Sequence, residues 1–258
     1  MYKQNHLSNI RVVLSHTSHP GNIGAAARAM KVMGLGNLYL INPRHFPDPQ
    51  ATAMAAGADD VLDSAVLCPS IDVALQDTVL TVGMTARMRD ISNEVMLPRV
   101  AMPQVWLQAQ TQPVALLFGT EMSGLTNEEA SRCHVLVNIP ANPDFSSLNL
   151  AAAVQVIAYE LSVAANNDLK LESLAQPAAH QLVEGFMTHL EKTLHEVGFF
   201  TTQNPARMMQ RLRRLYARAR LESDEINILR GILSVTTEYN ARLKLRYRQE
   251  NQDIENTR

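Results

Sequence analysis

The chain has 258 residues, of which 46% are hydrophobic and 19% are charged, and its formal net charge is −2 at pH 7. This length is enough for one large α/β domain with an appendage or for two domains of ordinary size. The composition excludes an intrinsically disordered chain and a bulk polycation, so the overall charge does not indicate nucleic acid as a partner.

The chain has two cysteines, Cys68 and Cys133, which lack the paired spacing of a zinc site or a redox motif. We therefore expect a reducing compartment with buried thiols and, because the eight histidines are scattered, no metal. No apolar stretch has the length of a membrane span, and the first ten residues, MYKQNHLSNI, lack the core of a signal peptide. These features predict a cytoplasmic protein without a membrane segment.

Short apolar runs alternate with helix-like patterns over the first two thirds of the chain. The runs lie at residues 10–15, 37–42, 65–68, 79–83, 114–119 and 134–139. Most of the stretches between them are long enough for a helix, as parallel strands require. We therefore predict a doubly wound α/β sandwich with a parallel sheet of six strands. Ligands of such sheets bind at the carboxyl ends of the strands.

The first loop of interest, SHPGNIGAAARAM at residues 18–30, follows a strand and opens a helix. Gly21 and Gly24 could bring backbone amides close to a phosphate. Their spacing is G-x-x-G, and the next strand ends without the acid that would hold a ribose, which disfavours a nucleotide-dependent oxidoreductase. Arg28, one turn beyond Gly24, is either a solvated helix arginine or a functional residue.

Two further loops carry polar residues in unusual density. FGTEMSGLT, at residues 118–126, places two glycines around Glu121, as in a tight turn whose backbone is free to meet a ligand, although a plain turn would look similar. NPDFSSLN, at residues 142–149, precedes an apolar helix that closes near residue 166. Ser146 or Ser147 could cap this helix, but a cluster of polar residues also favours a ligand at its N-terminus.

The remainder of the chain is polar and then helical. Residues 167–177 read as a linker between a domain at 1–166 and a helical extension at 178–258. We predict three helices. The first covers residues 178–197, the second begins at Pro205 with Asn204 as its cap, and the third covers residues 224–247 with Ser223 as its cap. Residues 1–166 contain 9 Lys and Arg against 13 Asp and Glu, giving −4, whereas residues 167–258 contain 14 against 12, giving +2.

The second of these helices has no acidic residue between positions 205 and 220. Four of its arginines recur at steps of four, three and four and so share one face: Arg207, Arg211, Arg214 and Arg218. The expected packing side consists of Met208, Leu212, Leu215 and Ala219. Because solvated faces usually mix signs of charge, we predict that the arginine face binds RNA phosphates.

Taken together, the three loops resemble the signature motifs of the SPOUT methyltransferases, in the TrmH-like class that acts on ribose 2′-hydroxyls. The resemblance covers residues 8–165 and rests on Asn22 with Arg28 six positions later, then FGTEMSGL, then SSLNL before an apolar helix. The segments SHTSHPGN, LTNEE and ANPDFSSLNLA are similar to those of bacterial enzymes that methylate cytidine or uridine ribose in tRNA.

This resemblance implies a parallel sheet with a C-terminal trefoil knot, a small helical RNA-binding extension, and a homodimer in which the neighbouring subunit completes each site. It implies S-adenosylmethionine as cofactor and tRNA as substrate, methylated at position 32, the first nucleotide of the anticodon loop. By the same resemblance the cofactor contacts Met84, Thr85, Ala86, Gly119, Ile139, Ser146, Ser147, Leu148 and Asn149.

Methyl transfer from a sulfonium is an in-line displacement, in which orientation supplies most of the catalysis. The family account gives Arg28 the central role, sometimes as a general base. Because the pKa of an arginine lies far above neutral pH, neutralising it at pH 7 would cost roughly 8 kcal/mol. We therefore favour a charged Arg28 that clamps a phosphate and stabilises the developing alkoxide. Asn22, Glu121, Ser147 and Asn149 would orient Arg28 and the ribose.

Two other functions are compatible with the same fold. One keeps the chemistry and changes the substrate to ribosomal RNA, and the other is a catalytically silent RNA-binding protein. The presence of Asn22, Arg28, Glu121 and Asn149 argues against a silent protein.

Overall fold

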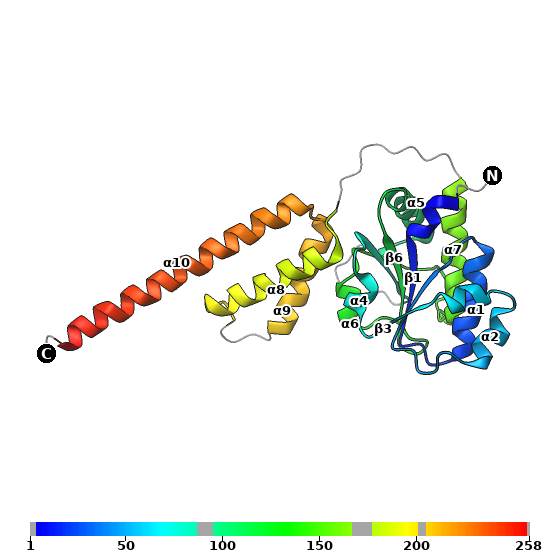
Figure 1. Ribbon diagram of the computed structural model, residues 1–258, viewed down its shortest axis with the longest axis horizontal. Helices are drawn as coiled ribbons and strands as arrows, with labels where there is room; N and C mark the ends of the chain where they lie inside the picture. The colour runs from blue at the N-terminus through cyan, green and yellow to red at the C-terminus, as the bar shows by residue number, and fades with distance from the viewer. Residues whose placement is uncertain (1–3, 87–94, 167–176, 201–204, 257–258) are drawn as a thin grey trace.

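A computed structural model describes residues 4–86, 95–166, 177–200 and 205–256. Figure 1 shows a sheet flanked by helices and, beside it, a narrower group of helices from which the last helix extends. None of the helices in the described ranges is long and apolar enough to cross a membrane.

The sheet has seven strands, and every pairing between neighbours is parallel. The strand order is β3-β2-β1-β6-β4-β7-β5. The bounds are β1 Ile10–Ser15, β2 Asn37–Ile41, β3 Val66–Cys68, β4 Leu80–Met84, β5 Val95–Met96, β6 Val114–Phe118 and β7 Val135–Val137. Six strands coincide with predicted apolar runs. The seventh, β5, was not predicted because two residues are too few to show a periodic pattern.

Helices cover both faces of the sheet, so the strands are buried on both sides. One face carries α1 Pro20–Val32, α2 Pro49–Ala55, α3 Asp59–Asp63, α5 Pro98–Ala109 and α7 Leu150–Asn166, and the other carries α4 Ile71–Leu75 and α6 Asn127–Ser131. A short 3-10 helix, η1 Gln4–Asn9, precedes β1. Side chains along β1 point alternately to the two faces of the sheet. Val12 therefore packs in the core on the α1 side, and Val13 packs in the core on the α4 side.

The helical part consists of α8 His180–Glu196, α9 Pro205–Ala219 and α10 Ser223–Asn256, around a core that includes Phe186, Met209 and Ile226. The first two helices agree with the prediction, whereas α10 extends past the predicted end at residue 247 and includes Ser223 as its first helical residue. The predicted cap Asn204 and residues 167–176 of the predicted linker lie outside the described residues.

The packing side of α9 differs from the prediction. Met209 is buried, and Leu212 and Tyr216 pack beside it, whereas Leu215 is 50% exposed and the predicted Ala219 is exposed. The predicted Met208 is half-buried and is not part of this core. The helix turns its Tyr216 ring onto Phe186, at 4.8 Å between centroids and near a right angle. This orientation still leaves the predicted arginines on the outer side: Arg207, Arg211 and Arg218 are exposed, and Arg214 is half-buried.

Candidate active site

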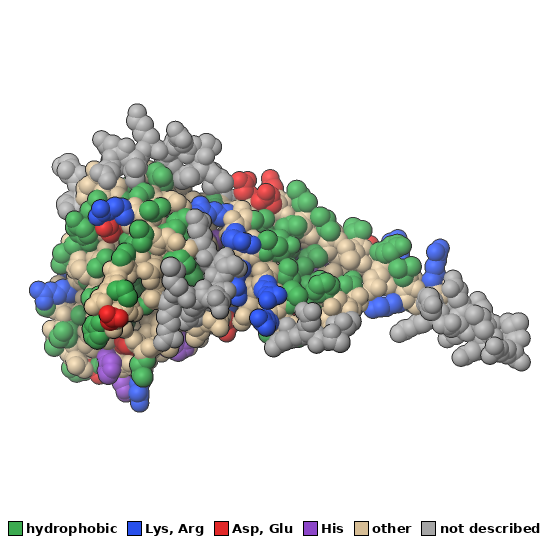
Figure 2. Space-filling view, turned by 180° about the vertical axis from the view of Figure 1, so that it is seen from behind, with side chains coloured by type: hydrophobic (Ala, Val, Ile, Leu, Met, Phe, Trp, Pro, Cys, Tyr) green, Lys and Arg blue, Asp and Glu red, His purple; other side chains and the backbone are tan. Residues whose placement is uncertain are grey.

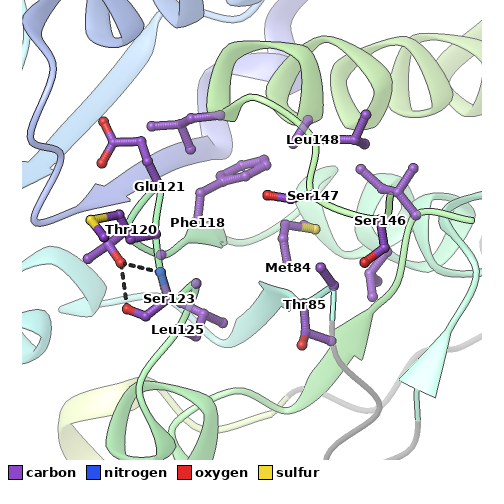
Figure 3. A pocket seen from close by; sticks show the side chains of 18 residues that line it. Met84, Thr85, Phe118, Thr120, Glu121, Ser123, Leu125, Ser146, Ser147 and Leu148 are labelled. Carbon is purple, nitrogen blue, oxygen red and sulfur yellow. Dashed lines mark hydrogen bonds between the residues drawn. The ribbon is translucent and has the colours of Figure 1, made fainter. Parts of the chain in front are cut away.

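A cavity lies at the carboxyl edge of the sheet, between the segments that follow β4, β6 and β7. Figure 3 shows the β6–α6 loop, with Glu121 and Ser123, facing the β7–α7 loop, with Ser146 and Leu148, across this cavity. Eight of the nine predicted cofactor residues line it: Met84, Thr85, Ala86, Gly119, Ile139, Ser146, Ser147 and Leu148. The ninth, Asn149, is not among the lining residues but lies next to Leu148.

The β6–α6 loop keeps its shape through a tight turn closed by backbone hydrogen bonds. Thr120 N donates to Gly124 O at 3.2 Å, and Gly124 N donates to Thr120 O at 2.9 Å. Gly124 has φ +67, and a Cβ on Gly119 would lie 2.1 Å from the carbonyl carbon of Gly124. Both glycines are therefore required by the turn itself, in which Ser123 N also donates to Thr120 Oγ1 at 3.2 Å.

Glu121, at the tip of this turn, binds the start of α1. Its carboxylate accepts hydrogen bonds from Ser18 N at 3.1 Å, Ser18 Oγ at 3.1 Å, His19 N at 3.2 Å and Asn22 Nδ2 at 3.0 Å. His19, the residue before the helix, makes no capping hydrogen bond with its side chain, and the first turn has no acid. Glu121 therefore caps α1 from a different loop.

The charge of Glu121 is stabilised by this arrangement. Burial alone would raise the pKa of the carboxyl, but hydrogen bonds from Asn22 and from the amides of Ser18 and His19 outweigh it and lower the pKa to about 2. A carboxylate at a helix N-terminus also interacts favourably with the helix dipole. Glu121 is therefore ionised at neutral pH and acts as an acceptor.

Asn149 connects the third loop to the same group. Asn149 Nδ2 donates to Asn22 Oδ1 at 3.0 Å, so the three side chains form a chain of hydrogen bonds, Asn149 to Asn22 to Glu121. Asn149 Oδ1 also accepts from Ala151 N at 2.9 Å. Asn149 is thus the cap of α7, and the expectation that Ser146 or Ser147 serves as cap was wrong. The amide of Asn149 can do both because its oxygen accepts from the helix while its nitrogen donates to Asn22.

The other predicted catalytic residues lie in different places. Ser147 lines the cavity. Arg28 is exposed on α1, two turns into the helix, and does not line the cavity. No described residue forms a hydrogen bond or an ion pair with its guanidinium. The structure of one chain therefore brings together Asn22, Glu121 and Asn149, and it shows no partner for Arg28 within the described ranges.

Sequence reasoning missed part of the cavity wall. Phe118, Thr120, Met122, Ser123, Gly124, Leu125, Val137, Leu150 and Ala153 also line the cavity. Most of them are immediate neighbours of the predicted residues on the same loops, so extending each motif by a few positions would have found them. Met122 is 93% exposed and forms part of the rim.

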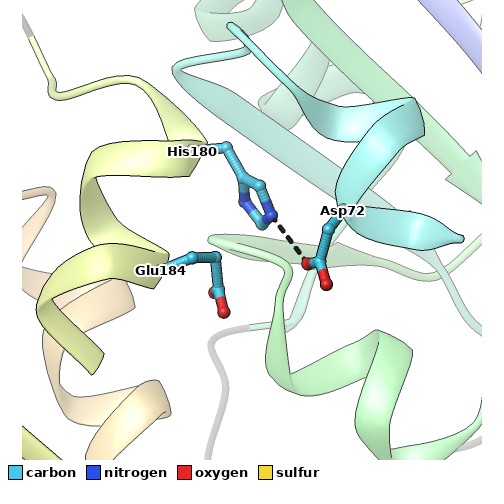
Figure 4. Close-up of side chains that lie close together, drawn as sticks. All are labelled: Asp72, His180 and Glu184. Atoms are coloured by element: carbon cyan, nitrogen blue, oxygen red, sulfur yellow. Dashed lines mark hydrogen bonds and ion pairs between the residues drawn. The ribbon is translucent and has the colours of Figure 1, made fainter. Parts of the chain in front are cut away.

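A second polar cluster lies where the helical part meets the sheet. Figure 4 shows His180 and Glu184 of α8 beside Asp72 of α4, with His180 Nε2 and Asp72 Oδ1 3.2 Å apart. Both carboxylates already have cationic partners, since Arg132 Nε donates to Asp72 Oδ1 at 3.1 Å and Arg213 binds Glu184. Hydrogen bonding from His180, and then from Arg132, holds the pKa of Asp72 well below its usual range despite burial. Because these charges are already balanced, we interpret the cluster as an ion-pair network that fastens the helical part, and not as a metal site.

The sequence of the chain matches known proteins over both of its parts. Residues 9–159 match the SpoU rRNA Methylase family. The chain belongs to the SpoU methylase family. Residues 181–250 match the C-terminal domain of the tRNA methyltransferase TrmJ. This SpoU methylase is therefore a methyltransferase of the TrmJ type.

Relatives of this SpoU methylase match most of its length. The tRNA (cytidine/uridine-2′-O-)-methyltransferase TrmJ of Pectobacterium atrosepticum is 50% identical over 233 residues, which cover 88% of this chain and 96% of the relative. The Escherichia coli O6:K15:H31 protein of the same name is 48% identical over 240 residues, covering 91% and 97%. The crystal structure of TrmJ from Z. mobilis has a TM-score of 0.78 at 35% identity and covers 87% of this chain and 97% of its own. A probable methylase family protein from Haemophilus influenzae has a TM-score of 0.60 at 44% identity, covering 93% and 99%.

Proposed function

We propose that this methyltransferase transfers the methyl group of S-adenosylmethionine to the 2′-hydroxyl of a cytidine or uridine ribose in tRNA. One observation carries the proposal: three loops that are far apart in the sequence meet at one cavity, and Asn22, Glu121 and Asn149 are hydrogen bonded beside it. The names of the relatives supply the substrate.

The residues around the cavity fit the proposed cofactor. The wall combines apolar side chains such as Met84, Leu125 and Ile139 with hydroxyls such as Thr85 and with the backbone of three loops. Apolar walls suit a purine ring, and a few hydroxyls and backbone groups suit a ribose and an amino acid group. When bound, the cofactor supplies an electrophilic methyl group.

The chain's own residues then have to present the ribose hydroxyl in line with that methyl group. Glu121 fixes the start of α1 and, through Asn22, the amide of Asn149, so that side chains from all three loops have defined positions at the cavity edge. Arg28 stays charged, binds a phosphate next to the reacting ribose and stabilises negative charge that develops on the hydroxyl oxygen. Ser147, in the cavity wall, orients the ribose.

The site of methylation on the tRNA is proposed to be position 32, the first nucleotide of the anticodon loop. A nucleotide in a loop can leave the base stack at low cost, which exposes its 2′-hydroxyl to a cavity at the edge of a sheet. We place the reaction in the cytoplasm, in agreement with two free, buried cysteines.

The arginine face of α9 is proposed to hold the body of the tRNA. Three of its four arginines are exposed, and Figure 2 shows Lys and Arg side chains gathered where the helical part meets the sheet-containing part. Arg214 Nε is buried without a hydrogen-bond partner among the described residues. Burial, and then repulsion from Arg211, lower the pKa of Arg214. A bound phosphate would give Arg214 Nε a hydrogen-bond acceptor and would offset the repulsion between the two arginines. This face is therefore suited to binding a polyanion.

We also propose the division into residues 1–166, 167–177 and 178–258, the trefoil knot and a homodimer. Strand β7 lies between β4 and β5 in the sheet, a strand order that is compatible with a knot. Neighbouring helices α5 and α7 expose apolar side chains, among them Val100 at 54% and Tyr159 at 52%, which suit a subunit interface. A second subunit completes each site, in keeping with an exposed Arg28. Sedimentation should give twice the mass of one chain.

The proposal is tested by incubating the protein with labelled S-adenosylmethionine and unmodified tRNA. We expect label in the RNA and a phosphodiester bond next to the methylated ribose that resists alkali. A tRNA transcript already methylated on the ribose of position 32 should accept no label. Label on a base, or no transfer to tRNA, would contradict the proposal.

The variant Asn149→Ala separates a role at the site from a role as helix cap. Loss of a cap alone lowers stability by about 1 kcal/mol, so we expect methyl transfer to fall far more than the melting temperature. Asn166→Ala, at the other end of α7, is the matched control because Asn166 Nδ2 bonds only to Ser162 O among described residues. Loss of folding with normal specific activity in Asn149→Ala would show that Asn149 is only a cap.

A further inference from the structure

Most cations of the sheet-containing part already have partners. Among the described residues, Lys31 pairs with Asp60, Arg99 with Glu160, and Arg132 with Asp72 and Glu128. Arg11 donates to two backbone carbonyls and stacks on the ring of Tyr39. Two described cations of residues 1–166 have neither an acidic nor a carbonyl partner for their side chains, namely Arg28 and Arg44.

Arg44 is exposed and lies in the β2–α2 connection, directly beside the loop that Glu121 holds. Its backbone N donates to Thr17 O at 3.0 Å, and the next residue along that loop, Ser18, donates to Glu121. The connection is also fixed on its other side, because Asn42 Nδ2 donates to Pro69 O at 3.1 Å. The position of Arg44 relative to the hydrogen-bonded group at the site is therefore set by backbone contacts.

Three exposed histidines lie next to Arg44 in the chain or in the connection that its backbone contacts. His45 follows it, and His16 and His19 lie in the β1–α1 connection, where His16 N donates to Ile41 O at 2.8 Å. Figure 2 shows histidine side chains beside a Lys or Arg side chain at the lower edge of the sheet-containing part. We call Arg44, His45, His16 and His19 the Arg44 patch.

We propose that the Arg44 patch binds the RNA backbone at a phosphate that flanks the methylated ribose. The inference rests on the proposed function and adds a substrate contact to it. Residues 1–166 carry a net charge of −4, so a polyanion that approaches the cavity is repelled unless cations at its edge oppose that charge. The guanidinium of Arg44, which has no hydrogen-bond or ion-pair partner among the described residues, provides that opposition.

Filter binding of tRNA across a salt series tests this contact with Arg44→Ala. Losing one phosphate contact should lower the slope of log Kd against log salt concentration by roughly 0.7 to 0.9. We expect several-fold weaker tRNA binding at low salt, turnover near wild type at saturating tRNA, and unchanged affinity for S-adenosylhomocysteine. Arg44→Lys should keep most of the slope.

Lys31→Ala is the matched control, because it removes one positive charge from the same part of the chain but from a cation already paired with Asp60. Its slope should equal that of wild type. A wild-type slope in Arg44→Ala, or a loss of S-adenosylhomocysteine binding in that variant, would overturn the proposal and leave the patch to another partner or to a structural role. Failure of the wild-type protein to methylate tRNA would instead contradict the proposed function.

Discussion

Replacing Glu121 with Gln removes the negative charge at the start of α1 and keeps the size of the side chain. The carboxylate accepts from two backbone amides, a hydroxyl and Asn22, whereas a glutamine amide directs one NH2 group at some of these donors. The substitution therefore weakens the cap of α1 and releases Asn22, which also holds Asn149.

The expected loss of stability follows from the pKa of Glu121. A carboxyl whose pKa falls from 4.5 to about 2 on folding contributes at most about 3 kcal/mol at pH 7. The side chain is partly open to water, which screens its interactions, so we expect about 1 to 1.5 kcal/mol. Because the folded pKa is depressed, this contribution is complete above pH 4.5 and is lost as the pH falls toward 2. Wild type and Glu121→Gln should therefore converge below pH 4.5.

Urea unfolding in a series from pH 7 down to pH 3 measures this difference, and methyl transfer at saturating substrates measures the effect on the site. We expect turnover to fall at least tenfold, since misorienting the side chains at the cavity edge raises the barrier by about 1.4 kcal/mol or more. Glu128→Gln is the control, because Glu128 lies in α6, directly after the loop that contains Glu121, but is largely exposed and pairs with Arg132. Equal stability and turnover of Glu121→Gln and wild type at pH 7 would refute the assigned role.

Three further predictions concern charged groups. Arg28→Ala should lower turnover by orders of magnitude with nearly unchanged S-adenosylhomocysteine affinity, and Arg28→Lys should recover little because a point charge does not replace the guanidinium fork. Near-wild-type turnover of Arg28→Ala would show that Arg28 is only a solvated surface residue. Asp72→Asn should remove the negative charge that Arg132 and His180 share and lower the free energy of unfolding of the helical part in calorimetry by about 1 to 2 kcal/mol, and an unchanged transition would contradict the fastening role. Replacing four arginines of α9 with Ala should lower the salt slope of tRNA binding by about 3, and the four are Arg207, Arg211, Arg214 and Arg218. An unchanged slope would mean that the RNA is held by another part of the protein.

Much of the fold could be predicted because its signals are local. Each of the six predicted strands is an apolar run of several residues, and the apolar run after Asn149 forms α7. The cofactor residues were predicted from the resemblance of short motifs to a known family, and eight of the nine line one cavity because the carboxyl ends of parallel strands meet at the same edge of a sheet. The arginine face of α9 follows from helical spacing alone.

The remaining features depend on which segments the fold brings together. Glu121 caps a helix that begins about a hundred residues earlier, and Asn149 bonds to Asn22 at a separation of 127 residues. Neither contact has a local signature, because any acid or amide near a turn shows the same pattern. The predicted packing side of α9 was wrong because the ring of Tyr216 packs against Phe186 on another helix. By itself the sequence determined the strands, the helices and the composition of the loops, since these depend on neighbours along the chain. Only the tertiary structure decided which polar groups meet, since that depends on strand order and helix rotation.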